Sequence, residues 1–146
     1  MFQTTTDLYD DPTSKAFPVE SKQIAIEIEN CHTEIIINEF SDKLFIVITQ
    51  LNKIGSMMLV TAENNRISNN KLINVQSLLG ASDNQLYQTF GSCLLQEILQ
   101  IRPNERRPLL LSLALSKKMF IGDSEESIMF IPNLLPGVLK AIKTIL

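Results

Sequence analysis

The sequence has very few of the residues from which most catalytic and metal centres are built. It contains one histidine, His32, and two cysteines, Cys31 and Cys93. Neighbouring residues in a strand or turn point in different directions, so Cys31 and His32 are not expected to face each other as nucleophile and base. Without Cys-x-x-Cys or His-x-x-x-His spacing, these residues do not make a structural zinc site. The sequence therefore predicts no catalytic residue, no metal site and no disulfide framework.

Glycine-rich loops and basic stripes are missing as well. The five glycines are widely separated, so no phosphate-cradling loop and no cofactor pocket is predicted. The net charge of −3 and the isoelectric point near 5.1 argue against a nucleic-acid surface. The one local basic cluster, Arg102, Arg106 and Arg107, is bracketed by Pro103 and Pro108 and is predicted to lie on a solvated loop.

No apolar run approaches the ~20 residues that a membrane helix needs. Residues 1–11 are polar and acidic, unlike a signal peptide, and no Asn-x-Ser/Thr acceptor site occurs. We therefore expect a cytoplasmic or nuclear protein without a membrane partner.

What the sequence does contain is the pattern of one α+β domain. A chain of 146 residues with 45% hydrophobic residues is of the size and composition of a single globular domain. Residues 1–20, rich in threonine and aspartate and with two prolines, are predicted to be a flexible lead-in. The folded domain is expected to span residues 21–146.

Six β-strands are predicted from the apolar patterns. Ile24, Ile26 and Ile28 alternate with smaller or charged residues, which is the period of a half-buried strand. The run 44–48 is apolar throughout, so both of its faces should be buried. A tight turn at residues 52–55 is expected to return the chain directly into the neighbouring strand. The predicted strands are 21–28, 33–40, 44–48, 56–61, 72–78 and 109–116; they form an antiparallel sheet in which the first four make a meander.

Two helices complete the expected fold. One covers residues 83–101, between the fifth and sixth strands, with Ser82 and Gln85 as a capping box. We expect this helix to cover the face of strand 109–116 that carries the small residues Ser112 and Ala114, since small residues permit close approach. The other helix begins at Asn133 and closes the chain. Residues 63–71 are expected to be a mobile loop, and residues 128–131 are an alternative seventh strand.

On the first helix, the main apolar stripe is formed by Leu86, Phe90, Leu94, Ile98 and Ile101. Leu95 and Leu99 form a second apolar line, roughly 100° from this stripe at about 3.6 residues per turn. Such a line is a candidate interface with another protein chain, although the C-terminal helix could cover it instead.

A series of short motifs in this order resembles the proteasome assembly chaperone 3 family. The motifs are Ser21-Lys22-Gln23, Phe40-Ser41, Val47-Ile48-Thr49-Gln50 with Lys53 and Gly55, Leu78-Leu79-Gly80, the Leu86/Phe90/Leu94 stripe and the leucine-rich strand 109–115, which together cover about residues 21–116. The resemblance implies a small non-catalytic protein that pairs with a related fourth chaperone or with itself. It also implies a role in guiding assembly of the α-subunit ring of the proteasome core particle. Residues 1–20 and 117–135 have no clear counterpart in the family pattern.

This resemblance leads to predicted contact residues. The turn at 52–55 and the asparagine-rich loop at 64–71 are expected to contact α subunits, and the second apolar helix line is expected to mediate dimerisation. An alternative reading is a small dimeric scaffold or adaptor subunit of a trafficking or GTPase-regulating complex, which fold alone does not distinguish. The candidate partner-binding residues are Asn52, Lys53, Gly55, Asn64, Asn65, Arg66, Leu95 and Leu99.

Overall fold

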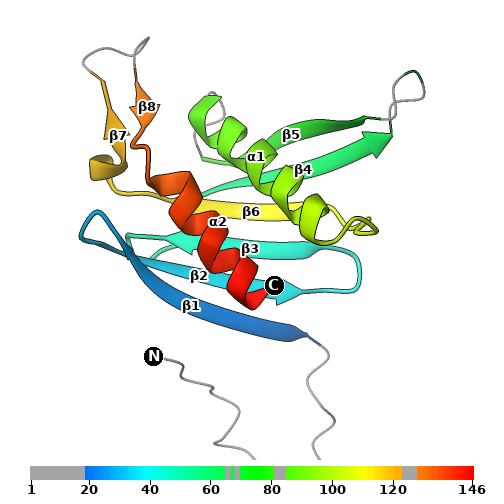
Figure 1. The fold of residues 1–146 in the computed structure, drawn as a ribbon, viewed down its shortest axis with the longest axis horizontal. Helices are drawn as coiled ribbons and strands as arrows, with labels where there is room; N and C mark the ends of the chain where they lie inside the picture. Colours follow the sequence, from blue (N-terminus) through cyan, green and yellow to red (C-terminus); the bar gives the residue numbers. More distant parts are fainter. Residues whose placement is uncertain (1–18, 65–66, 68–69, 81–84, 123–127) are drawn as a thin grey trace, which may run out of the picture.

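A computed structural model of the chain describes residues 19–64, 67, 70–80, 85–122 and 128–146. One six-stranded sheet carries both long helices on a single face (Figure 1). The predicted lead-in 1–18 and the predicted cap at Ser82 lie outside the described residues. The elements are β1 (Glu20–Ile28), β2 (Cys31–Glu39), β3 (Leu44–Thr49), β4 (Ser56–Asn64), β5 (Lys71–Leu79), α1 (Gln85–Ile101), β6 (Leu109–Ala114), a 3₁₀ turn (Lys117–Met119), β7 (Phe120–Ile121), β8 (Met129–Phe130) and α2 (Leu134–Ile145).

The chain does not return directly from β3 to β4, because β6 lies between them. The strand order is β1-β2-β3-β6-β4-β5. β6 pairs in parallel with β3 and antiparallel with β4, so that Leu109 lies opposite both Leu44 and Val60. The predicted four-strand meander and the purely antiparallel sheet are therefore wrong: β1–β3 form a three-strand meander, and β4–β5 form a separate hairpin. Residues 50–55 cross the end of β6, a span of about 10 Å over two strand spacings.

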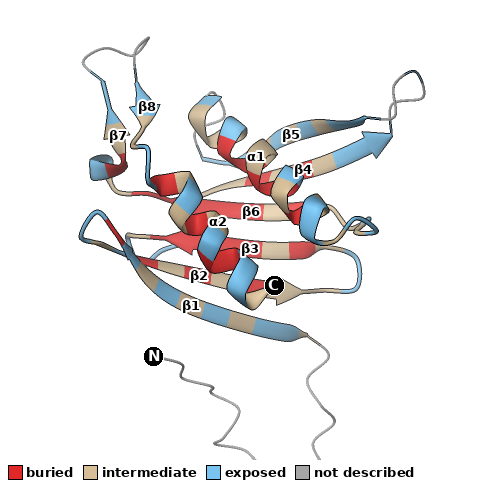
Figure 2. Cartoon of the chain, viewed as in Figure 1, coloured by how far each residue is buried: buried red, intermediate tan, exposed pale blue. Residues whose placement is uncertain are grey.

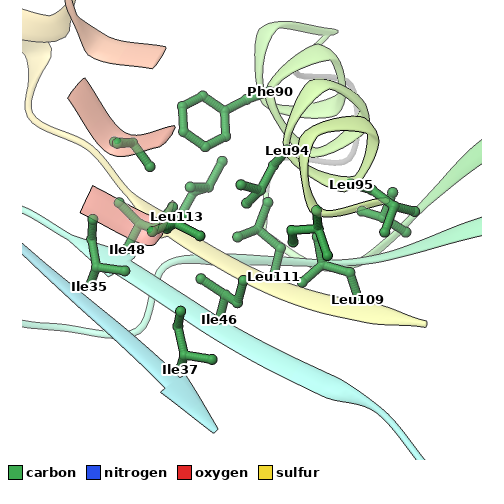
Figure 3. Packing of buried hydrophobic residues seen from close by; sticks show 14 of the residues in the cluster. Ile35, Ile37, Ile46, Ile48, Phe90, Leu94, Leu95, Leu109, Leu111 and Leu113 are labelled. Carbon is green, nitrogen blue, oxygen red and sulfur yellow. The ribbon is translucent and has the colours of Figure 1, made fainter. Parts of the chain in front are cut away.

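The helix α1 covers the leucine face of β6 and not its small face, contrary to the prediction. Leu109, Leu111 and Leu113 are at most 1% exposed and share the core with α1 (Figure 3). The close approach comes from a glycine on the helix itself. A Cβ atom on Gly91 would lie 3.0 Å from the Met58 sulfur, so the absence of a side chain there lets α1 settle on β4.

Both helices are buried along the side that faces the sheet (Figure 2). Phe90, Leu94 and Ile98 of α1 are at most 1% exposed, as the periodicity predicted. α2 packs on β1 and β2 and lies beside α1. Glu97, which interrupts the apolar pattern of α1, pairs with Lys143 of α2 at 3.4 Å and so links the two helices.

The largely polar stretch after β6 contains a 3₁₀ turn, Lys117–Met119, and a short strand, β7. β7 pairs antiparallel with β8, so the alternative seventh strand at 128–131 is present, as part of a second, two-stranded sheet. Aromatic contacts hold this hairpin to α1. The Phe130 ring lies 5.8 Å from the Phe90 ring edge to face and 5.3 Å from the Phe120 ring, and Tyr87 stacks on Phe130 at 6.5 Å.

Alanine substitution should affect stability very differently at Gly55, in the loop 50–55 that crosses the end of β6, and at Gly137, in α2. A Cβ atom on Gly55 would lie 2.0 Å from the Leu113 carbonyl oxygen, which is fixed in β6. We expect Gly55→Ala to lower the free energy of unfolding by about 3 kcal/mol, since backbone must move. Gly137→Ala, in α2, meets only the Ile28 side chain at 3.4 Å and should be neutral or stabilising by about 0.4–1 kcal/mol. Urea unfolding measures both, and equal values for the two variants would contradict this account.

Candidate functional site

In the described part of the chain, the histidine and the cysteines do not assemble into a metal-binding cluster. The His32 side chain is 61% exposed at the start of β2 and lies 3.5 Å from the Glu34 carboxylate. Cys31 and Cys93 are both free thiols. Within the described ranges, no three metal-ligating side chains come together, and no helix is long and apolar enough to cross a membrane.

The sheet face opposite the helices is apolar. Strand register places the side chains of Ile36 (β2), Phe45 and Val47 (β3), Met57 and Leu59 (β4) and Leu110 and Ser112 (β6) together on this face, here called the open sheet face. Both long helices lie on the other side (Figure 1), and in the part of the chain that the structure describes no further helix or strand packs here. Phe45, Leu59 and Leu110 are only half-buried. Val47 and Ser112 are already buried in the monomer. The accessible apolar part of the open sheet face is therefore formed by Ile36, Phe45, Met57, Leu59 and Leu110.

The crossing loop, residues 50–55, is held rigidly at one end of this face. The Thr49 hydroxyl accepts hydrogen bonds from the backbone N–H groups of Leu51 (3.2 Å) and Lys53 (3.3 Å). The Ser112 hydroxyl accepts one from Gly55 N–H at 3.1 Å. Asn52 has a φ of 53°, in the left-handed region that asparagine tolerates. A loop this well bonded presents its outward side chains in one arrangement.

Those outward side chains include two that the sequence analysis missed. Leu51 is 46% and Ile54 is 60% exposed, beside the exposed residues Asn52 and Lys53. The sequence could have indicated their exposure, because Ile54 lies inside the predicted turn at residues 52–55 and Leu51 directly precedes it, and burial is not expected in a turn. The loop therefore offers apolar and basic groups side by side.

The second predicted α-subunit contact lies far from the first. Gly55 precedes the first residue of β4 and Asn64 is its last, so the two are about 30 Å apart at about 3.3 Å per residue. Asn65 and Arg66 lie outside the described residues. The turn and the asparagine-rich loop thus mark opposite ends of the sheet and do not form one continuous contact.

The predicted dimerisation pair is not an outward apolar line. Leu95 is 2% exposed within the core, and Leu99 is half-buried beside it. Both side chains face β4 and β5, where with Asn64 they line a groove of about 490 Å³. The structure therefore places Asn64, which was predicted to contact an α subunit, beside Leu95 and Leu99, which were predicted to mediate dimerisation. The three residues border one groove and do not form two separate exposed surfaces.

The three clustered arginines lie on the loop between α1 and β6, as predicted, and Arg106 is exposed. Arg102 and Arg107, however, are partly buried and paired with carboxylates, so they are not simply solvated. The Arg107 guanidinium donates to the carboxylates of Glu105 (2.8 Å) and Glu39 (2.9 Å), and to the Phe40 carbonyl at 2.9 Å. Arg102 donates to Glu39 as well. This ion cluster ties the loop between α1 and β6 to the end of β2.

The ion cluster has clear electrostatic consequences. Hydrogen bonding from Arg107 lowers the pKa of Glu105 from 4.5 to about 2. Arg102, and then Arg107, lower the pKa of Glu39 against the opposing effect of burial. The side chains of Glu105 and Glu39 are only 7% and 13% exposed, so solvent screens these pairs weakly.

Comparison with known protein families assigns the chain. A family model described as proteasome assembly chaperone 3 matches residues 46–126, which is more than half of the 146 residues. The chain belongs to the proteasome assembly chaperone 3 family. The matched range contains the crossing loop, α1 and β6, and it continues past residue 116, where the motif resemblance ended. Among curated proteins, none matches this family member.

A solved structure shares its fold. The structure is described as a novel chaperone complex for yeast 20S proteasome assembly, and one of its chains superposes with a TM-score of 0.58 at 19% sequence identity. The alignment covers 86% of this chain and 97% of that chain. The shared arrangement therefore extends beyond the family match to most of the domain.

The ion cluster predicts an acid-dependent loss of stability. Because the pKa of Glu105 is lowered on folding, its contribution is present above pH 4.5 and is lost as the pH falls toward 2. Glu105→Gln should lower the free energy of unfolding at pH 7 by up to about 3.5 kcal/mol, because the pKa falls from 4.5 to about 2 on folding and each pKa unit corresponds to about 1.4 kcal/mol. The difference from the parent protein should shrink toward pH 2. Urea unfolding from pH 7 to pH 2 tests this.

Glu27→Gln, at an exposed carboxylate on β1, is the matched control and should change stability little. A Glu105→Gln deficit that stayed constant across the pH range would show that the variant acts through packing and not through charge.

Proposed function

We propose that this family member is a non-catalytic chaperone that promotes assembly of the proteasome core particle by binding α-ring subunits transiently, and that it acts as a dimer. The family match carries the proposal, and the shared fold with a chain of the yeast assembly complex supports it. The adaptor alternative has only the general fold class in its favour. A location in the cytoplasm or nucleus remains a prediction.

The open sheet face is the proposed dimer interface. Apolar faces of two sheets stack about 10 Å apart and interdigitate their side chains, as in β-sandwiches. Phe45, Leu59 and Leu110 would become fully buried by such stacking, and a second copy or a related chaperone could supply the opposing face. This placement replaces the predicted one on Leu95 and Leu99, since Leu95 is already within the core.

The crossing loop is the proposed contact for an α subunit. It lies at the end of the strands, so it stays accessible when two open sheet faces stack. Exposed Leu51 and Ile54 supply apolar area, and Lys53 supplies a charge that orients the partner. A contact of one short loop is small, which suits a chaperone that must dissociate.

A charge on the open sheet face should break the dimer. Leu59→Glu and Phe45→Glu each place a carboxylate in the centre of the proposed interface, where it would be desolvated without a partner. Light scattering coupled to size exclusion should show the dimer mass falling to that of the monomer. If the parent chain is monomeric alone, the same variants are tested for loss of the partner chaperone in native mass spectrometry of the endogenous complex.

Ile101→Glu is the control, because Ile101 is 39% exposed and lies at the end of α1, on the helix side. Variants that fold by circular dichroism but keep the parent mass and partner would exclude the open sheet face as the dimer interface.

Charge reversal in the crossing loop should weaken capture of α subunits and leave the dimer intact. The double variant Lys53→Glu with Ile54→Asp removes both types of contact and leaves Asn52, which needs positive φ, unchanged. We expect at least about tenfold weaker capture, equivalent to about 1.4 kcal/mol, in affinity purification followed by mass spectrometry. Lys118→Glu, at an exposed lysine of the 3₁₀ turn, should retain full capture. Undiminished capture by the double variant would contradict the assignment of the loop.

A further inference from the structure

A groove lies on the helix side of the sheet, between α1 and the outer hairpin β4–β5. Its volume is about 490 Å³, within the range of sites that enclose a ligand. It is distinct from the open sheet face, which is on the other side of the sheet, and from the crossing loop, which is at the other end of β4. Its lining residues are Ala62, Asn64, Lys71, Leu95, Leu99, Pro103, Asn104, Glu105, Arg106 and Arg107.

The groove follows from the side chains that β4 presents to α1. Met58 and Val60 are large, buried and in contact range of Gly91, so they fill the space beneath the first half of the helix. The next residue on that face is Ala62, whose single methyl group leaves space beneath the second half. Leu99 forms the accessible apolar wall on the helix side, since Leu95, which also borders the groove, is only 2% exposed.

Two cations line this groove without a partner. Lys71, at the start of β5, and Arg106, in the loop after α1, are both exposed. Among the residues that the structure describes, neither forms an ion pair or a side-chain hydrogen bond. The other charged residues of the lining, Glu105 and Arg107, neutralise each other at 2.8 Å. The groove therefore combines an apolar wall with two uncompensated positive charges.

We propose that this groove binds an extended peptide segment of a partner protein that carries aliphatic side chains and at least two carboxylates. The carboxylates pair with Lys71 and Arg106, and the aliphatic side chains pack on Ala62, Leu99 and Pro103. The amides of Asn64 and Asn104 provide polar groups at the rim that can bond a peptide backbone. None of the lining residues that the structure describes is aromatic, so these residues offer no stacking surface of the kind with which proteins bind single-stranded nucleic acid.

This inference rests on the groove alone and is independent of the proposed proteasome role. The probe is a short fluorescein-labelled peptide of alternating leucine and glutamate, with a leucine–glutamine peptide for comparison. Fluorescence anisotropy with the full chain should show binding of the glutamate peptide that weakens as salt rises. The glutamine peptide should bind at least about tenfold more weakly.

Three variants locate the binding. Lys71→Glu with Arg106→Glu should weaken the glutamate peptide at least about tenfold. Ala62→Leu, which fills the floor of the groove, should weaken both peptides while circular dichroism and the melting temperature show a folded protein. Lys118→Glu with Lys140→Glu, two exposed lysines outside the groove, is the charge-matched control and should leave binding unchanged.

Several outcomes would overturn the proposal. They are absence of binding by the parent chain, equal weakening by the control pair, and full binding by both groove variants. A shift in oligomeric state caused by Lys71→Glu with Arg106→Glu would also overturn it, because the occupant would then be a second copy of the chain. Loss of peptide binding with retained capture of α subunits would separate this groove from the proposed chaperone contact.

Discussion

The structure depends on the insertion of β6 between β3 and β4. Three inward leucines of β6, Leu109, Leu111 and Leu113, are all at most 1% exposed and pack under α1. The strand pairs with β3 over Leu109–Ala114 and with β4 over Leu109–Leu113. This one strand joins the meander β1–β3 to the hairpin β4–β5, which otherwise share no ladder. The ion cluster of Glu39, Arg102, Glu105 and Arg107 fixes the entry to β6, since it anchors the preceding loop on the end of β2.

Placing both helices on one face has a direct consequence for function. A sheet with a covered and an open face buries half of its apolar side chains internally and leaves the other half for a partner. Partly exposed apolar side chains such as Phe45, Leu59 and Leu110 are the kind of patch that marks protein interaction sites. Under the proposed function, this face would pair with a partner sheet, and the loops at the ends of the strands would stay free for weaker contacts.

The three surfaces differ in physical character. The open sheet face is broad and apolar, the crossing loop is small and rigid, and the groove beside α1 is concave and basic. Their separation, with the loop and the groove at opposite ends of β4, permits independent engagement of different partners. Because the backbone of the crossing loop is bonded to Thr49 and Ser112, it can be recognised without an ordering cost on binding.

The sequence by itself determined the local elements and the family. Alternating isoleucines, the continuous run at β3 and the Phe90–Leu94–Ile98 stripe were sufficient to place six strands and two helices, because apolar periodicity is a property of neighbouring residues. Only the tertiary structure decided that β6 separates β3 from β4, which face α1 covers, and that Arg102 and Arg107 are paired with acidic side chains. These outcomes depend on contacts between residues far apart in the chain, such as Glu39 with Arg107, and no local pattern encodes them. For the same reason Leu95 could be recognised as apolar from the sequence, whereas its burial in the core, at the wall of a basic groove, required the fold.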